Sequence, residues 1–290
     1  MCLRSNQFKH SHYNLGIKFH RTNPVHMNNR SPLVYPKVTI VTPSLNQGQF
    51  INATIQSVLA QAYPNLEYLV MDGGSSDNTI EVLNSYSDRL KWISEKDEGQ
   101  TNAINKGLRM ASGEILAYLN ADDLLLPGAL VKVAHKFMGN PDAMWVTGKC
   151  RIVDENNREV RRLITAYKNL LLRLHNPSLL FITDYISQPA TFWRADIFRN
   201  LGPLEENLHY AMDYEYWLRL NAKFPLVIIP EYLAAFRVHS QSKNTNAGHR
   251  DVYVDEERII IERYTRSKLM KALHDLHRWF MTTIYSLING

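Results

Sequence analysis

A regular alternation of strand and helix signals between residues 37 and 140 constrains the fold more than any other feature of this chain. The apolar runs KVTIVTPS, LEYLVMD, LKWISE and EILAYLN are each followed by a segment whose apolar residues recur at helical spacing, such as QFINATIQSVLAQ and LPGALVKVAHKFMGN. Four strand-then-helix units in succession predict an α/β fold, with a largely parallel sheet and helices on both of its faces.

Polar residues stand where the four expected strands end. They are Pro43, Ser44 and Asn46, then Asp72, then residues 95–97, and finally residues 120–123. In open α/β sheets, ligands bind in the crevice beyond the carboxyl ends of the strands. We therefore expect these four clusters to meet at one edge of the sheet and to line a ligand site.

Composition limits the class of protein. With 290 residues, 45% of them hydrophobic, the chain can bury one large core, with or without an appendage. Its two cysteines, Cys2 and Cys150, are far apart, which argues against a disulfide framework and a cysteine-type zinc site and favours a reducing compartment. No apolar run reaches the roughly 18 residues of a membrane span. We expect a cytoplasmic protein, either soluble or peripheral on the cytoplasmic face of the membrane.

The formal net charge of +5 is concentrated at the amino terminus, because six basic residues precede Glu67, the first acidic one. We therefore expect no nucleic-acid partner for the folded part. Residues 1–35 lack sustained apolar periodicity and the apolar core of a signal peptide, and we interpret them as a disordered basic arm. The arm either contacts an anionic membrane surface or is a tail without function. The sequence also permits a start at Met27.

The second half of the chain has fewer clear units. The run AMWVTGKCRIVDENN predicts a strand and hairpin, and a short amphipathic helix is expected from about residue 213 to 222. Residues 250–290 form an expected amphipathic helical segment, with an apolar stripe at Leu269, Leu273, Leu276, Phe280, Ile284 and Leu287. Such a stripe covers the core, lies on a membrane or pairs with a second subunit; the oligomeric state is left open.

The adjacent carboxylates of Asp122 and Asp123, in NADD, interrupt an apolar stretch. Two like charges in a cleft repel each other and are also penalised by desolvation, so a compensating cation is expected. Mg²⁺ and similar ions prefer oxygen ligands and usually take one or two carboxylates together with substrate phosphates. An aspartate that caps a helix beginning near Pro127 is the alternative, and these residues alone leave both open.

Five motifs in order carry a family resemblance. The segments VTIVTPSLNQGQF, LEYLVMDGGSSDNT, EKDEGQTNAINKGLRMASGEILAYLNADD, HYAMDYEYWLRL and FRVHSQS, spanning about residues 36–242, resemble glycosyltransferase family 2 enzymes. The resemblance implies the GT-A fold, a Rossmann-like three-layer sandwich with a mostly parallel central sheet, here with a carboxyl-terminal helical extension. The catalytic domain is expected at residues 36–245, with a nucleotide-sugar half at 36–125 and an acceptor half at 126–245.

The resemblance also implies an activity. Such an enzyme transfers a sugar, with inversion, from a nucleoside-diphosphate sugar to a hydroxyl of a saccharide or lipid-linked acceptor, using Mn²⁺ or Mg²⁺, in the synthesis of cell-surface polysaccharide or glycolipid. A sugar-phosphate nucleotidyltransferase is a weaker interpretation, because TPSLNQGQF lacks the glycine-rich basic loop of that class. A catalytically inactive relative that binds carbohydrate or serves as an assembly subunit is the other alternative.

Donor-site roles are implied position by position. The residues expected to contact the nucleotide sugar are Pro43, Ser44, Asn46, Asp72, Asp97, Gln100, Asn102, Lys106, Asn120 and Ala121. Asp72 would meet the base, although it can also serve as a turn-former, and most relatives carry a second aspartate where this chain has Gly73. Lys106 would attract the diphosphate from a helix whose amino end is also positive, or would lie on a solvated helix face. Asn120, an aspartate in most relatives, would lie near the ribose.

Metal and acceptor roles follow the same motifs. The expected metal ligands are Asp122, Asp123 and His239, and the expected catalytic base is Asp213, preceded by Met212 where the family usually has glutamate. Asp213 can also cap its helix, and His239 can be a loop histidine bonded to backbone. The expected acceptor-side residues are Gln188, Trp193, Glu215 and Trp217. For the tryptophans packing is the alternative, and for Glu215 a surface charge on its helix.

Overall fold

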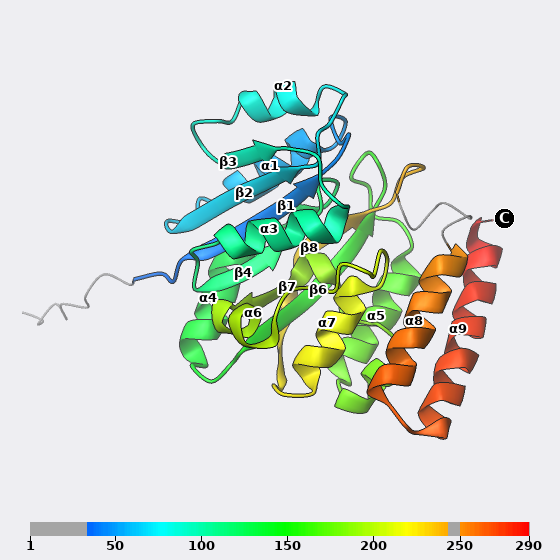
Figure 1. Cartoon of the computed structure of the whole chain (residues 1–290). Coiled ribbons are helices and arrows are strands. Elements are labelled where there is room, and N and C mark those ends of the chain that lie inside the picture. The colour runs from blue at the N-terminus through cyan, green and yellow to red at the C-terminus, as the bar shows by residue number, and fades with distance from the viewer. Residues whose placement is uncertain (1–33, 243–249, 290) are drawn as a thin grey trace, which may run out of the picture. The chain divides into compact units, whose positions relative to one another are not determined.

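The computed structural model describes residues 34–242 and 250–289. The described residues from Tyr35 onward belong to one compact unit. The predictions for the basic arm and for Met27 concern residues outside the described ones. The unit contains a mixed sheet of eight strands in the order β3-β2-β1-β4-β7-β6-β8-β5, with helices around it (Figure 1).

The first half of the sheet contains the four strand-then-helix units expected from the sequence. Its elements are β1 (Val38–Ser44), α1 (Ile51–Leu59), β2 (Leu66–Asp72), α2 (Thr79–Asn84), β3 (Lys91–Ser94), α3 (Gln100–Met110), β4 (Ile115–Tyr118), β5 (Leu124–Leu125) and α4 (Ala129–Gly139). β1 pairs in parallel with β2 and with β4, and β2 pairs in parallel with β3. The carboxyl ends of these four strands therefore lie at one edge of the sheet, as predicted.

The second half completes the sheet with strands from distant parts of the chain. Its elements are β6 (Trp145–Val153), α5 (Arg162–Arg173), the 3-10 helices η1 (Pro177–Phe181) and η2 (Gln188–Ala190), β7 (Thr191–Arg194), α6 (Ala195–Leu201), α7 (Met212–Asn221) and β8 (Leu226–Arg237). β7 runs antiparallel between β4 and β6, while β8 pairs in parallel with β6 and antiparallel with β5. The predicted α/β fold with a mostly parallel central sheet is confirmed.

Two hydrophobic cores, one on each face of the sheet, create the three layers. Ile40 of β1 packs in the core formed with α1, α2 and α4, whereas its neighbour Val41 faces the core formed with α3, α6, α7 and α8. This alternation follows from the two-residue period of a strand. Helix α3 approaches β1 so closely that a Cβ on Gly107 would lie 2.4 Å from a methyl group of Val41. Glycine at this position is therefore what allows the close contact.

The carboxyl-terminal segment is two helices, α8 (Arg250–Tyr264) and α9 (Lys268–Asn289), which lie side by side (Figure 1). α9 buries His274, but its apolar stripe is only partly covered, since Leu269, Leu276 and Phe280 keep 64%, 60% and 53% of their surface exposed. Closing the core is thus not the role of these three side chains. Among the helices of residues 34–242 and 250–289, none has the length and apolar character needed to cross a membrane.

Candidate active site

The loops after β1 and β2 are joined into one wall at the crevice edge. Asn46 adopts a left-handed backbone conformation with φ of 53°, its N–H donates to Ser75 Oγ at 2.7 Å, and its Oδ1 accepts from the Ser76 N–H at 2.8 Å. Ahead of Asn46, the hydroxyl of Ser44 is buried and has no hydrogen-bond partner among the residues that the structure describes, and Pro43 is also buried. The expected nucleotide-side residues of β1 therefore stand beside a fixed turn.

Asp72 is fully engaged in shaping that turn. Its side chain is 2% exposed and accepts from the N–H groups of Gly74 and Ser75 and from the hydroxyls of Ser75 and Ser94, at 2.5 to 3.1 Å. These donors occupy both carboxylate oxygens. The turn-forming alternative therefore describes Asp72 better than contact with a base.

Asp97 lies against the glycine that replaces the family's second aspartate. A Cβ on Gly73 would be 2.6 Å from Asp97 Oδ2, and Asp97 Oδ1 accepts from the Gly99 N–H at 2.9 Å. The half-buried carboxylate of Asp97 thus occupies the space into which a side chain at position 73 would project. Asp97 therefore places a carboxylate beside position 73, where this chain has glycine.

The three expected donor residues of α3 have different partners. Gln100 Nε2 donates to Asn120 Oδ1 at 2.8 Å and so joins the NADD segment. Asn102 instead donates to Glu206 at 2.9 Å, and Lys106 forms an ion pair with Glu95 at 2.8 Å. Acidic side chains of the protein thus hold both Asn102 and Lys106, and their expected contact with the nucleotide stays a prediction.

The backbone of NADD is held by a single hydroxyl from α1. Thr54, fully buried, has its Oγ1 2.7 Å from the carbonyl of Ala121 and 2.8 Å from that of Asp123. Ala121 is itself 3% exposed, so its contribution to a donor site is limited to the backbone. This clamp fixes the direction in which the two aspartates point.

Asp123 points inward. It is 0% exposed, its Oδ1 accepts from the Arg237 N–H at 2.9 Å, and its Oδ2 accepts from Asn120 Nδ2 at 3.3 Å. Burial and the neighbouring Asp122 carboxylate raise the pKa of Asp123 well above its ordinary value. Because its oxygens bond to β8 and to Asn120, Asp123 braces the site. Its expected role as a metal ligand stays a prediction.

Asp122 points toward His239, with Asp122 Oδ2 3.0 Å from His239 Nε2. The Asp122 side chain keeps 21% of its surface exposed, and the His239 ring packs against Phe50 with ring centroids 4.2 Å apart. Arg237 Nη1 donates to the Asp122 carbonyl at 2.6 Å and holds the residue from behind.

The Asp122–His239 pair fits a divalent ion in the way such ions are usually bound. Within residues 34–242 and 250–289, no three His, Cys, Asp or Glu side chains gather as a complete protein cage. Mg²⁺ and Mn²⁺ do not require one when substrate phosphates and water complete the shell, and imidazole is an accepted ligand for the softer of these ions. A carboxylate and an imidazole side by side at a strand end are therefore suitable donors.

Asn120 connects the donor side to Gln188. Asn120 Nδ2 lies 3.4 Å from Gln188 Oε1, and Gln188 Nε2 donates to the Tyr118 carbonyl at 2.6 Å. The amide of Asn120 also donates to Asp123, which an aspartate at position 120 would repel instead. Asparagine thus suits this surrounding better than a third carboxylate would.

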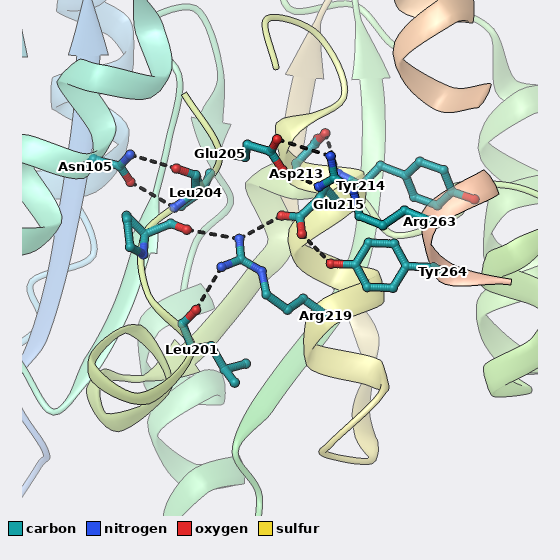
Figure 2. Close-up of polar contacts among 11 residues, drawn as sticks. Asn105, Leu201, Leu204, Glu205, Asp213, Tyr214, Glu215, Arg219, Arg263 and Tyr264 are labelled. Carbon is teal, nitrogen blue, oxygen red and sulfur yellow. Dashed lines mark hydrogen bonds and ion pairs between the residues drawn. The ribbon is translucent and has the colours of Figure 1, made fainter. Parts of the chain in front are cut away.

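Asp213 stands in the first turn of α7 and is half-buried, with its Oδ1 accepting from the Tyr214 N–H at 2.8 Å (Figure 2). Burial raises the pKa of Asp213, an effect that Lys168 of α5 opposes. Two further acids face it, and burial raises the pKa of Asp184 to about 8 and that of Glu257 to about 7. Asp213 is thus placed where a carboxylate binds a proton more readily than it would in water.

Three of the expected acceptor-side residues are buried. Trp193 and Trp217 are 0% exposed and pack on each other with ring centroids 5.9 Å apart, so neither offers a face to a sugar ring. Glu215 is 3% exposed, accepts from the Tyr264 hydroxyl and pairs with Arg219 at 2.7 Å (Figure 2). It is neither a surface charge nor a free base.

Several residues that shape the site were not found from the sequence. Arg237 stands two positions before His239 in FRVHS, and that adjacency was the available signal. Lys168 and Asp184 come from the weakly patterned region between residues 150 and 210, and Glu257 from the segment expected only as an amphipathic helix. Their proximity to Asp213 is a product of tertiary packing.

Comparisons with known proteins agree with this geometry. The family model described as glycosyl transferase family 2 matches residues 39–202. The chain is 23% identical over 248 residues to an uncharacterised glycosyltransferase of Rickettsia prowazekii, covering 84% of this chain and 77% of that one. It is 27% identical over 227 residues to an uncharacterised glycosyltransferase of Haemophilus influenzae, covering 74% and 69%.

Two solved structures share the fold. The mannosyltransferase PcManGT of Pyrobaculum calidifontis, in complex with GDP-Man and Mn²⁺, superposes with a TM-score of 0.66 at 19% identity, covering 88% of this chain and 74% of that one. Residues 1–349 of S. aureus TarS, in complex with UDP-GlcNAc, give 0.58 at 16% identity, covering 81% and 69%. The match spans 42% of the longer TarS chain. Because the family model covers more than half of the sequence, including NADD, the chain belongs to glycosyl transferase family 2.

Proposed function

We propose that this glycosyltransferase moves a sugar, with inversion at the anomeric carbon, from a nucleoside-diphosphate sugar to a hydroxyl of a saccharide or lipid-linked acceptor. One observation carries the proposal: two chemically different groups gather around the end of β4. Asp122 pairs with His239 just beyond the strand, and Asp213 supplies a carboxylate from α7. Burial raises the pKa of the strand residue Tyr118, and the charge of Asp213 raises it further. Binding a diphosphate and accepting a proton require such a pair of groups.

The donor would lie along the wall formed by the loops after β1 and β2. Asn46 and Asp97 offer polar groups there, and Asn120 would meet the ribose with its amide. The related structures support a nucleotide-sugar donor, because TarS was solved with UDP and UDP-GlcNAc and PcManGT with GDP-Man. The panel of sugar nucleotides described below distinguishes the base and the sugar of the donor.

Asp122 and His239 are the residues that would hold Mn²⁺ or Mg²⁺. When bound, the ion supplies positive charge that stabilises the developing negative charge of the leaving diphosphate. Arg237 and Thr54 keep Asp122 in place through its own carbonyl and those of its neighbours. Asp123 remains inside, where it anchors the strand that leads to His239.

Asp213 is the proposed catalytic base. The acceptor oxygen attacks the anomeric carbon from the face opposite the diphosphate, the carbon–oxygen bond to the diphosphate breaks, and the hydroxyl proton moves to a carboxylate oxygen of Asp213. The raised pKa of Asp213 increases its affinity for that proton. One displacement at the anomeric carbon inverts its configuration.

The setting we propose is cytoplasmic synthesis of cell-surface polysaccharide or glycolipid. The distant pair of cysteines supports the compartment. The exposed apolar side chains of α9, Leu269, Leu276 and Phe280, support peripheral contact with a membrane that carries a lipid-linked acceptor.

A thermal-shift panel with Mn²⁺ and the UDP, GDP, dTDP and CDP sugars tests the donor class, because a ligand that binds only the folded state raises its melting temperature. We expect one nucleotide family to raise it and the matching sugar nucleotide to release nucleoside diphosphate on incubation. Stabilisation without release or transfer from any donor would favour the alternative of a catalytically inactive, carbohydrate-binding subunit.

A further inference from the structure

A glutamate of α8 caps the loop that leads into the helix of Asp213. Glu256 is 6% exposed, its Oε1 accepts from the His209 N–H at 2.7 Å, and its Oε2 accepts from the N–H groups of Tyr210 and Ala211 at 2.8 and 2.9 Å. Three consecutive backbone donors thus converge on one carboxylate from a segment about 45 residues further along the chain.

This carboxylate supplies a hydrogen-bond acceptor at the amino end of α7. Ala211 is the residue before the first turn of α7, and no side chain of its own caps the helix there. Free N–H groups at a helix start need acceptors, and a negative charge at that end is favourable. Met212, where the family usually has glutamate, cannot accept such bonds. Of these groups Glu256 accepts from the N–H of Ala211, two residues before Asp213, and it also accepts from the N–H groups of His209 and Tyr210 in the loop ahead of the helix.

Helix α8 also contacts the acceptor side at a second place. At its carboxyl end, Arg263 pairs with Glu205, and the Tyr264 hydroxyl donates to Glu215 of α7 (Figure 2). The loop from residue 205 to 211 and the first turns of α7 are therefore held by α8 at both ends. The position of Asp213 depends on how α8 is seated.

Glu256 also belongs to a group of charges around Asp213. The groups whose charges act on one another around Asp213 are Lys168 of α5, Asp184, Tyr118 of β4, and Tyr253, Glu256 and Glu257 of α8. These four carboxylates face two cations, Lys168 and, beside Glu257, Arg278 of α9, and like charges in a cleft repel. Clusters in which burial and like charges shift pKa values gather at functional sites.

We propose that Glu256 is a positioning residue for the catalytic base: it fixes the backbone of residues 209–211 and thereby sets the orientation and the charge environment of Asp213. This inference rests on the role of Asp213 proposed above. Glu256 itself touches no reacting atom.

The experiment compares Glu256→Gln with Asp255→Asn, which removes the same charge from the exposed neighbouring residue of α8. Hydrogen–deuterium exchange reports the three capped amides, and ¹³C NMR titration of the side-chain carboxyls, with the Asp213 signal assigned by its loss in Asp213→Asn, reports the base. In Glu256→Gln we expect exchange at residues 209–211 to accelerate at least about tenfold. We also expect the pKa of Asp213 to fall, because Glu256 is a negative charge that raises it. Asp255→Asn should change neither.

Glu256→Asp keeps the experiment decisive if glutamine prevents folding. Aspartate keeps the charge but is one methylene shorter, so we expect faster exchange at residues 209–211 with little change in the titration of Asp213. If the Glu256 variants that fold match Asp255→Asn in both measurements, the positioning role is wrong. Full transferase activity in Asp213→Asn would instead overturn the base assignment while leaving the exchange and titration results intact, so the two failures are distinguishable.

Discussion

Asp122 and Asp123 are adjacent in the chain but have opposite surroundings. Asp123 bonds to the Arg237 backbone and to Asn120, whereas Asp122 is partly exposed and faces His239. The same distinction separates Asp72, whose oxygens are filled by the turn, from Asp97. At the residue scale, the acids still able to meet a substrate are those whose oxygens the protein has not already filled.

Asp213→Asn tests the base. The amide is nearly the same size but cannot take a proton from the acceptor, so we expect transfer to fall at least about 100-fold while nucleotide binding is kept. Nucleotide affinity by calorimetry and product formation with the best donor of the panel are the measurements. Asp142→Asn, an exposed acid, serves as the control, and near wild-type turnover in Asp213→Asn would show that another group is the base.

Asp122→Ala and His239→Ala test the metal pair. Removing either ligand should weaken Mn²⁺ binding in the presence of UDP or GDP by about tenfold or more, which electron paramagnetic resonance of free Mn²⁺ measures directly. Asp88→Ala removes an exposed acid and should leave the affinity unchanged. Equal Mn²⁺ affinity in all three variants would exclude Asp122 and His239 as the ligands.

At the element scale, the segments that the sequence predicted well are those in which the pattern of apolar residues matches the pattern of burial. β1, β2 and β4 are nearly continuous apolar runs, and α1 and α3 repeat apolar residues at helical spacing, so local pattern and tertiary environment agree. β7 is four residues long and lies antiparallel between β4 and β6, a placement decided by distant partners. The apolar stripe gives no sign of the break between α8 and α9, because all of its residues, from Leu269 to Leu287, lie within α9.

The same reasoning explains the candidate site. Asn46, Gln100 and Asp122 follow predicted strands, so topology brings them to the crevice edge. The direction of a side chain depends on contacts made across the fold. Asn102 donates a hydrogen bond to Glu206, and Asp123 accepts one from the backbone of β8. Glu256 reaches the loop before α7 from a segment whose only visible signal was amphipathicity.

Glu67 of β2 ties its strand to β1 and to the start of β4, and its replacement gives a pH-dependent prediction. Burial alone would raise the pKa of Glu67, but hydrogen bonds from Ser112, Thr39 and Lys37 outweigh it and lower the pKa to about 2. The stabilisation is therefore present above the ordinary pKa of 4.5 and is lost as the pH falls toward 2. Glu67→Gln should lower the free energy of unfolding by about 1–3 kcal/mol at pH 7.

Urea unfolding of Glu67→Gln at pH 7, 4.5 and 3 measures this loss. The difference from wild type should shrink from pH 4.5 to pH 3, because Glu67 of the unfolded chain, with its ordinary pKa of 4.5, then takes up a proton while the folded carboxylate stays charged. Glu81→Gln, on the exposed face of α2, should show little effect at any of them. A loss that stayed constant with pH would mean that the charge of Glu67 is not what its donors stabilise.

On the scale of the whole molecule, remote segments meet at the acid cluster. α5 contributes Lys168, the segment before η2 contributes Asp184, and α7 and α8 contribute Asp213 and Glu257. Burial raises the pKa of Asp184 to about 8 and of Glu257 to about 7. Folding therefore retains protons that the unfolded chain releases, and the stability of the protein is coupled to pH.

Asp184→Asn should expose this coupling. A raised pKa in the folded state gives stability that is present below the ordinary value of 3.8 and is lost as the pH rises through about 8. At pH 8 the free energy of unfolding of the variant, measured with urea, should thus exceed that of wild type by about 1 kcal/mol or more. At pH 5 the gain should be smaller. Asp142→Asn is the matched exposed control, and a gain that did not grow with pH would contradict the prediction.

The packing of α8 against the loop before α7 determines where the protein can be truncated without loss of the acceptor side. The family model ends at residue 202, and a cut near residue 245 would keep every candidate donor residue, the Asp122–His239 pair and Asp213. Such a piece would nevertheless lack Glu256, the acceptor for three amides ahead of the base. The smallest unit with a complete acceptor side therefore extends through α8. A domain boundary placed where the family model ends would exclude part of that side.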